Sequence, residues 1–198
     1  ICRAFRDPLG RSAFVMLSGA AIAVSITLLL GVARTRTETR NSFANTISGT
    51  DLVVGARSGS IPLLLYSVFR IGNATNNISW QSYRELASDP AVAWTIPLSL
   101  GDSHRGFRVL GTNTDYFQYF RYARTRSLSF TEGKRFDDVF DAVLGAEVAD
   151  ALGYSVGDQV VIDHGVGRIG FVSHKDKPFR VSGILARTGT PVDRTVHV

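Results

Sequence analysis

The sequence has almost no cysteine, because Cys2 is the only one among its 198 residues. A single thiol forms no intrachain disulfide, so a hydrophobic core must stabilise the folded part. Charge of one sign is in small excess: 22 lysines and arginines oppose 17 acidic residues, and the arginines are spread along the chain. Such a spread gives no continuous basic tract to neutralise a row of phosphates. Nucleic acid is therefore not expected as a partner.

The common catalytic motifs are also missing. Neither a Walker A sequence nor a G-x-S-x-G nucleophile elbow is present. Residues 165–170 (GVGRIG) fit G-x-G-x-x-G, but no helix pattern follows them and no acid stands about 20 positions further on to hold a ribose. We interpret them as a glycine-rich hairpin loop. The chain is predicted not to be an enzyme, with no catalytic residue and no cofactor, so any ATP hydrolysis occurs on another chain.

Metal-ligand spacing is absent as well. The candidate ligands match no recognised motif and are expected to be exposed in loops, although two of the histidines could face each other across a hairpin (His164 with His174; the others are His104, Asp163 and Asp176). A second acidic set lacks the alternation of a calcium loop and is expected to be a solvated face: Asp137, Asp138 and Asp141. No metal site is predicted.

What the chain does have is one long apolar run, and a mean hydropathy of +0.08 agrees with one such segment in a globular chain. Residues 13–33 contain no charge, and at about 1.5 Å per residue they span the roughly 30 Å core of a bilayer. The run predicts a transmembrane helix. A cleaved signal peptide is the alternative, but its apolar region is usually shorter, about 7 to 15 residues.

The flanking charges do not decide the orientation of this helix. Each flank has three arginines against one acid, a net +2 (Arg3, Arg6 and Arg11 with Asp7; Arg34, Arg36 and Arg40 with Glu38). The short flank that carries Cys2 favours an N-terminus inside the cell. Because no helix breaker occurs before Ser48-Gly49, the helix is expected to continue to about Ile47 as a stalk. The small residues Gly19 and Ala23 could admit another helix or simply face lipid.

Beyond the stalk the pattern changes to short strands and helices. Expected strands are 51–55, 92–100, 106–111, 142–144, 159–163, 179–185 and 195–198. Expected helices are 62–71, 80–88 capped by Ser79, a short one at about 116–120, and 146–152 ended by Gly153. Turns are expected at 101–103, 131–134 and 156–158. Since strands and helices mix without strict alternation, the predicted fold class is α+β.

Two apolar groups admit more than one interpretation. Helix 62–71 is too short to span a bilayer, so its apolar side chains are expected in the core, with docking on the membrane or a partner as the alternative (Leu63, Leu64, Leu65, Val68 and Phe69). The aromatic group is expected to pack in the core rather than stack on a ligand (Tyr116, Phe117, Tyr119 and Phe120).

Three stretches carry a family resemblance: DLVVGARSG, GKRFDDVFDAVLGAEVADALGYSVGDQVVI and FRVSGILARTGTPVD. Together with the membrane helix they resemble the MacB/FtsX-like permeases of ABC transporters. The matching positions are Gly145, Ala149, Leu152, Gly157, Asp158, Phe179, Val181 and Gly183. The resemblance implies a cytoplasmic segment at 1–12, the membrane helix at 13–33, a stalk at 34–49, and a periplasmic core domain at 50–198.

The same resemblance implies a place and partners. It implies a bacterial inner membrane with residues 34–198 in the periplasm, an ABC ATPase in the cytoplasm and a second permease subunit. It also implies a further partner in the periplasm, either another protein or a lipoprotein that is the cargo. The resemblance implies four transmembrane helices in each subunit, so three further helices are expected outside this chain. The start at Ile1 without methionine and the end on an expected strand also suggest a fragment. The alternatives are the ligand-sensing domain of a membrane receptor and, more weakly, an anchored extracytoplasmic enzyme.

Overall fold

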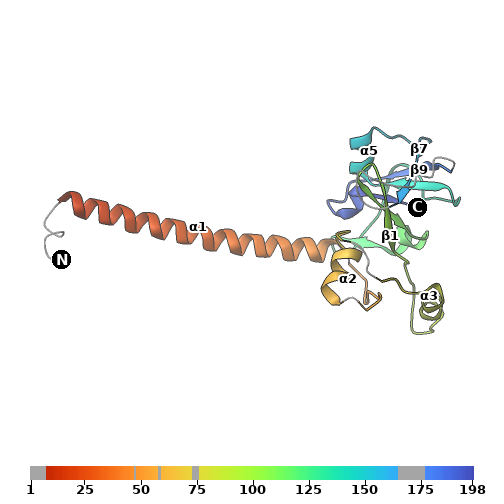
Figure 1. Cartoon of the computed structure of the whole chain (residues 1–198), viewed down its shortest axis with the longest axis horizontal. Helices are drawn as coiled ribbons and strands as arrows, with labels where there is room; N and C mark the ends of the chain where they lie inside the picture. The colour runs from red at the N-terminus through yellow and green to blue at the C-terminus, as the bar shows by residue number, and fades with distance from the viewer. Residues whose placement is uncertain (1–7, 47, 58, 73–75, 165–176) are drawn as a thin grey trace. The chain divides into compact units, whose positions relative to one another are not determined.

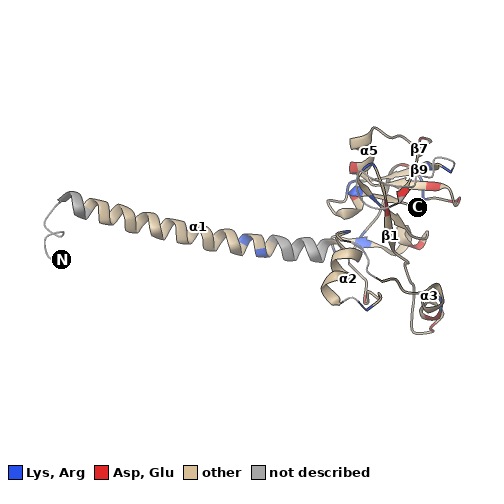
Figure 2. Ribbon diagram, in the orientation of Figure 1, with Lys and Arg blue, Asp and Glu red and all other residues tan. Residues whose placement is uncertain are grey.

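The computed structural model describes residues 8–46, 48–57, 59–72, 76–164 and 177–198, and the chain divides into two units, residues 1–43 and 44–198. The first unit is most of helix α1, Pro8–Thr46 (Figure 1). Its segment Ser12–Thr37 is long and apolar enough to cross a membrane. Figure 2 shows blue on this segment only toward its later end, where Arg34 and Arg36 lie in the sequence.

Helix α1 satisfies its own polar groups, as a helix in lipid must. Hydroxyls of Ser25 and Thr27 donate to the carbonyls of Ala21 and Ala23, four residues earlier, at 2.8 Å each. The helix runs without interruption from the apolar segment to Thr46, which confirms the predicted continuation of the helix beyond residue 33. That it crosses a membrane remains an expectation from its length and composition.

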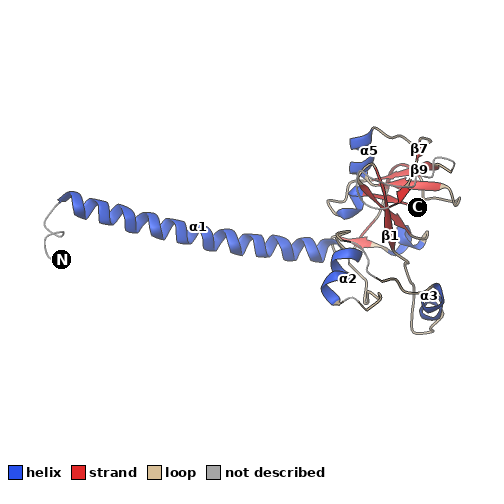
Figure 3. Cartoon of the chain, viewed as in Figure 1, coloured by secondary structure: helices blue, strands red, loops and turns tan. Residues whose placement is uncertain are grey.

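The second unit is built on a sheet (Figure 3). Eight strands of the described residues pair in the order β5-β9-β6-β10-β2-β1-β8, with β7 also pairing β9. Their bounds are β1 Ser99–His104, β2 Phe107–Gly111, β5 Phe130–Gly133, β6 Asp141–Leu144, β7 Gln159–Val160, β8 Asp163–His164, β9 Phe179–Leu185 and β10 Thr195–His197. A separate ribbon pairs β3 Arg121–Tyr122 with β4 Arg126–Ser127. The helices are α2 Ser60–Ser67, α3 Trp80–Ala87, α4 Asp115–Tyr119, α5 Ala146–Leu152 and the 3-10 turn η1 Pro191–Arg194.

Successive residues of the central strands belong to two different apolar clusters. Leu110 and Val143 pack in one cluster with Tyr116 and Phe117 of α4. Their neighbours Val109 and Leu144 pack in the other, with Val148 of α5. Because side chains alternate between the faces of a strand, this division gives the sheet a core on each side. The α+β prediction is confirmed, and so is the core position of the aromatic group, in which Tyr116, Phe117 and Phe120 are buried.

Several elements lie where their local sequence signals predicted them. Gly153 ends α5 in the left-handed conformation, with φ 69°, and Gly157 also has positive φ, 101°. The hydroxyl of Ser79 accepts from Ser82 N and caps α3 as predicted. Strand β9 has the predicted bounds, and β2, β6 and β10 lie within a residue of theirs. The predicted strand 159–163 is divided between β7 and β8.

The predicted strand 51–55 is wrong. These residues form no strand, and Leu52 and Val54 are 80% and 54% exposed. The apolar run suggested a buried strand, but a strand needs a neighbour to pair its backbone, and none of the described strands lies beside it. The predicted helix 62–71 is also too long, because α2 ends at Ser67.

The first hairpin lies later in the sequence than predicted. Residues 92–98 are not in a strand; Trp94 instead stacks on Tyr119, with ring centroids 5.4 Å apart. Residues 101–103, predicted as the turn, belong to β1, which contains a bulge there. The turn is Arg105-Gly106, with φ 48° and 90°, a pair of positive values that suits a two-residue hairpin. Arginine rarely adopts positive φ, so a turn beginning at Arg105 could not be predicted from its residue type.

Residues 131–134 were predicted as a turn, but 130–133 form strand β5 against β9. Gly133, which suggested a turn, instead allows two strands to approach closely. A Cβ on Gly133 would lie 2.2 Å from the carbonyl oxygen of Ser182, so only glycine permits this close approach of the two strands.

We expect Gly145→Ala to destabilise the domain, because a Cβ at 145 would lie 2.2 Å from the carbonyl oxygen of Val192. Overpacking of this kind costs about 1–3 kcal/mol. Urea unfolding of the full chain in detergent measures the change. Gly101→Ala is the control, because nothing lies within 4 Å of its added Cβ. Equal stability of the two variants would show that the backbone at 145 is not tightly packed.

Candidate functional site

The chain enters the domain through a small set of contacts, formed by Thr46, Ser48, Arg121 and Arg124, that we call the junction. Thr46, the last residue of α1, is 5% exposed. Ser48 N donates to the carbonyl of Arg121 at 3.0 Å, which makes an isolated β-bridge. Arg124 N donates to Ser48 Oγ at 2.9 Å. The backbone just after α1 is therefore hydrogen-bonded to the β3–β4 ribbon.

The ribbon that receives the junction is itself well fixed. Arg121 donates from Nη1 to the carbonyl of Gln118 at 2.6 Å and to that of Phe120 at 3.0 Å. Tyr122 and Phe120 are buried in the same apolar cluster as the central strands. A displacement of the chain at Ser48 would thus reach the core of the sheet through two hydrogen bonds and one packed ribbon.

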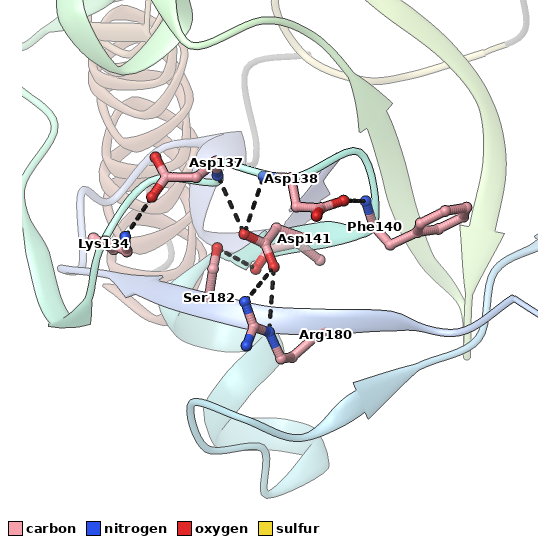
Figure 4. Close-up of polar contacts among 8 residues, drawn as sticks. Lys134, Asp137, Asp138, Phe140, Asp141, Arg180 and Ser182 are labelled. Atoms are coloured by element: carbon pink, nitrogen blue, oxygen red, sulfur yellow. Dashed lines mark hydrogen bonds and ion pairs between the residues drawn. The ribbon is translucent and has the colours of Figure 1, made fainter.

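The most connected polar group of the domain is Asp141, drawn in Figure 4. Its carboxylate accepts from the backbone N–H of Asp137 at 3.2 Å and of Asp138 at 3.3 Å. It also accepts from Arg180 Nη2 at 3.0 Å and Nε at 3.3 Å. Lys134 pairs with Asp137 in the same turn. The network ties the loop before β6 to strand β9.

The prediction of a solvated acidic face is correct for Asp137 and Asp138 and wrong for Asp141. Asp141 is only 4% exposed, because the residues next to it cover its side chain. Its carboxyl nevertheless lies near the surface of the domain. Burial alone would raise the pKa of this carboxyl. The N–H groups of Asp137 and Asp138 and the charge of Arg180 stabilise the carboxylate more, and the net effect lowers the pKa.

His104 was predicted to be an exposed loop histidine, and this is wrong. It lies in β1 and is buried, with Nδ1 2.6 Å from the carbonyl oxygen of Val161 and Nε2 3.1 Å from the hydroxyl of Tyr154. Burial lowers its pKa, more than the Val161 carbonyl raises it. Both ring nitrogens are thus occupied in structural hydrogen bonds, and His104 is not available as a metal ligand.

The other metal candidates are not brought together. Asp163 lies in β8 beside His164, while His174, Asp176 and the glycine-rich segment 165–170 lie outside the described residues. Within the described residues, no three histidine, cysteine, aspartate or glutamate side chains are grouped so as to hold a metal ion. The apolar side chains of α2 and the residues just after it were expected in the core, with docking on a membrane or a partner as the alternative. Val68 is buried, but Ile61 and Leu65 are exposed, so only part of the segment packs in the core.

Sequence reasoning missed a buried polar cluster on the α4 face of the sheet. His197 of β10 is fully buried, donates from Nδ1 to the Val143 carbonyl at 3.1 Å, and packs against Tyr116 with ring centroids 5.1 Å apart. Arg70, just after α2, is also buried and close enough to both to act on them electrostatically. Burial, with the charge of Arg70, lowers the pKa of His197 to about 3. The sequence signal for this cluster was weak: Arg70 and His197 each stand between two apolar residues.

These features define a class: an α+β domain that follows a helix long and apolar enough to cross a membrane. The sequence profile that matches is the MacB-like periplasmic core domain, over residues 13–198. A comparison with curated proteins finds no match. The chain belongs to the MacB-like periplasmic core domain family, which confirms the predicted resemblance. This is a family of ABC transporter permease components, which are not themselves enzymes.

Replacing Asp141 by asparagine should lower the free energy of unfolding by about 1–3 kcal/mol, because the charge-assisted hydrogen bonds are lost. Since the folded-state pKa is below the ordinary 3.8, the wild-type advantage exists above that pH and disappears as the pH falls below it. Urea unfolding at pH 7 and pH 3 measures both effects.

The matched control for that experiment is Asp150→Asn. Asp150 pairs with Arg187 at 2.6 Å, but both side chains are more than half exposed, and such pairs contribute little. A loss at Asp141 no larger than the loss at Asp150 would contradict the network's structural role.

His197 should make the domain sensitive to acid. Its folded-state pKa is about 3 and its ordinary value 6.5, so between these values the unfolded chain binds a proton that the folded domain does not. Stability therefore falls as the pH falls, by about 1.4 kcal/mol per unit from this group. In His197→Gln the stability at pH 7 should be lower, and its decline from pH 6 to 4 shallower than in the wild type. Parallel pH profiles would contradict the buried neutral histidine.

Proposed function

We propose that the chain is the N-terminal part of a permease subunit of a MacB-, FtsX- or lipoprotein-sorting-type ABC transporter. ATP hydrolysis on a cytoplasmic partner chain moves α1, and the periplasmic domain converts this movement into export or extraction of cargo. The observation that carries the proposal is the junction, in which the residue two positions after the end of α1 is hydrogen-bonded to the ribbon of the domain.

The proposal assigns each segment a place. Residues 1–12 lie in the cytoplasm, 13–33 in the inner membrane, and 34–198 in the periplasm, where 34–49 are the stalk and 50–198 the core domain. An uninterrupted helix from the apolar segment to Thr46 supports this assignment, because a helix transmits displacement along its axis whereas a flexible linker absorbs it. The partners are the ABC ATPase, a second permease subunit, and a periplasmic protein or lipoprotein cargo.

Two glycines inserted directly before Ser48 should uncouple transport from ATP hydrolysis in the complete transporter. The insertion separates α1 from Ser48 and the ribbon to which Ser48 is hydrogen-bonded. We therefore expect ATP hydrolysis within about twofold of normal and transport reduced by about tenfold or more. ATPase and transport assays on reconstituted vesicles measure the two rates.

The control for this experiment is the same insertion after Gly106, in the exposed turn between β1 and β2. It adds equal flexibility away from the junction and should leave transport near normal. Normal transport in both variants would show that the junction does not transmit movement.

A further inference from the structure

Arg70 has an unusual backbone conformation at the end of α2. Ile71 N donates to the carbonyl of Leu65, six positions earlier, at 3.0 Å and closes the end of the helix. Arg70, directly before Ile71, is left-handed, with φ 59°. Glycine adopts this conformation without strain and arginine does not, and strained residues of this kind cluster at functional sites. The side chain that this conformation carries is 92% buried, since Arg70 is 8% exposed.

The guanidinium of Arg70 is only partly hydrogen-bonded. Its Nη1 donates to the carbonyl of Ser67, and its Nε has no acceptor among the described residues. None of the described ion pairs includes Arg70. The Nε edge of a guanidinium is one of the two edges that carboxylates bind bidentately. A buried cation whose Nε has no acceptor is costly, so an anion bound at that edge would offset an existing penalty.

Two neighbours define the chemistry around this fork. The hydroxyl of Tyr116 is buried beside the guanidinium of Arg70, near enough to accept from it, and its own O–H has no acceptor among the described residues. His197 Nε2 is also buried without a partner, while Nδ1 is occupied by the Val143 carbonyl. Because Nδ1 faces a carbonyl oxygen, it carries the proton and the ring is neutral, so the charge of the cluster is the single charge of Arg70.

We propose that Arg70 and Tyr116 form a binding site for a small monocarboxylate, held by the Nε edge of Arg70 and the hydroxyl of Tyr116. One guanidinium neutralises one negative charge, and a dianion such as phosphate would leave an uncompensated charge in a largely buried position. The planar carboxylate also fits the fork better than a spherical halide does. His197, which Arg70 influences electrostatically, is neutral and adds no charge to the cluster. This inference does not rest on the proposed transport function.

Acetate is the probe, added to the full chain in detergent by replacing sodium chloride with sodium acetate at constant sodium. Binding to the folded state alone raises the melting temperature, and we expect a rise of about 3 °C when the acetate concentration is about five times its Kd. Arg70→Gly should abolish the rise while relieving the backbone strain, so the variant is expected to fold. Tyr116→Phe removes one hydroxyl and should reduce the rise.

Arg105→Gly is the matched control, because Arg105 is also left-handed, with φ 48°, but exposed at a hairpin tip. It should keep the wild-type rise, which separates binding from general effects of the salt. Line broadening of carbon-13 acetate gives a second, direct reading: broadening with the wild type and with Arg105→Gly, and none with Arg70→Gly. The same response in Arg70→Gly as in the wild type, or no broadening with the wild type, would overturn the proposal.

Discussion

The domain depends on strand β10, whose three residues pair with strands that lie far away in the sequence. Thr195, Val196 and His197 are parallel to β2 on one side, and Val196 and His197 are antiparallel to β6 on the other. All three are buried, and they join the β1–β2–β8 part of the sheet to the β5–β9–β6 part. Neither part has a complete core alone, so the sheet forms through non-local contacts, which fold slowly.

The sheet joined by β10 provides a rigid body to which other segments of the chain are attached. The junction attaches the backbone after α1 to the ribbon whose Tyr122 packs in one of the two core clusters. Asp141 holds the loop before β6 against Arg180 of β9. In a protein that transmits movement, such fixed connections matter more than any single reactive group, and this fits a family of permease components.

The sequence predicted elements with strong local signals and missed those decided by distant partners. Gly153 ends α5 and Ser79 caps α3, because these signals act within one turn of a helix. Residues 51–55 have the composition of a strand but no neighbour to pair with, and 131–134 form a strand because β9 lies beside them. The polar cluster could not be predicted, since Arg70 and His197 meet only after β10 is in place.

The most direct test of the account is whether the domain moves when the partner chain hydrolyses ATP. Spin labels at Ala151→Cys, an exposed position of α5, in a Cys2→Ser background would report the distance between two copies of the chain in the reconstituted transporter, where the proposed function expects two permease subunits. The account predicts different distance distributions with and without ATP. Identical distributions, with ATP hydrolysis demonstrated in the same sample, would contradict the transmission of movement to the domain.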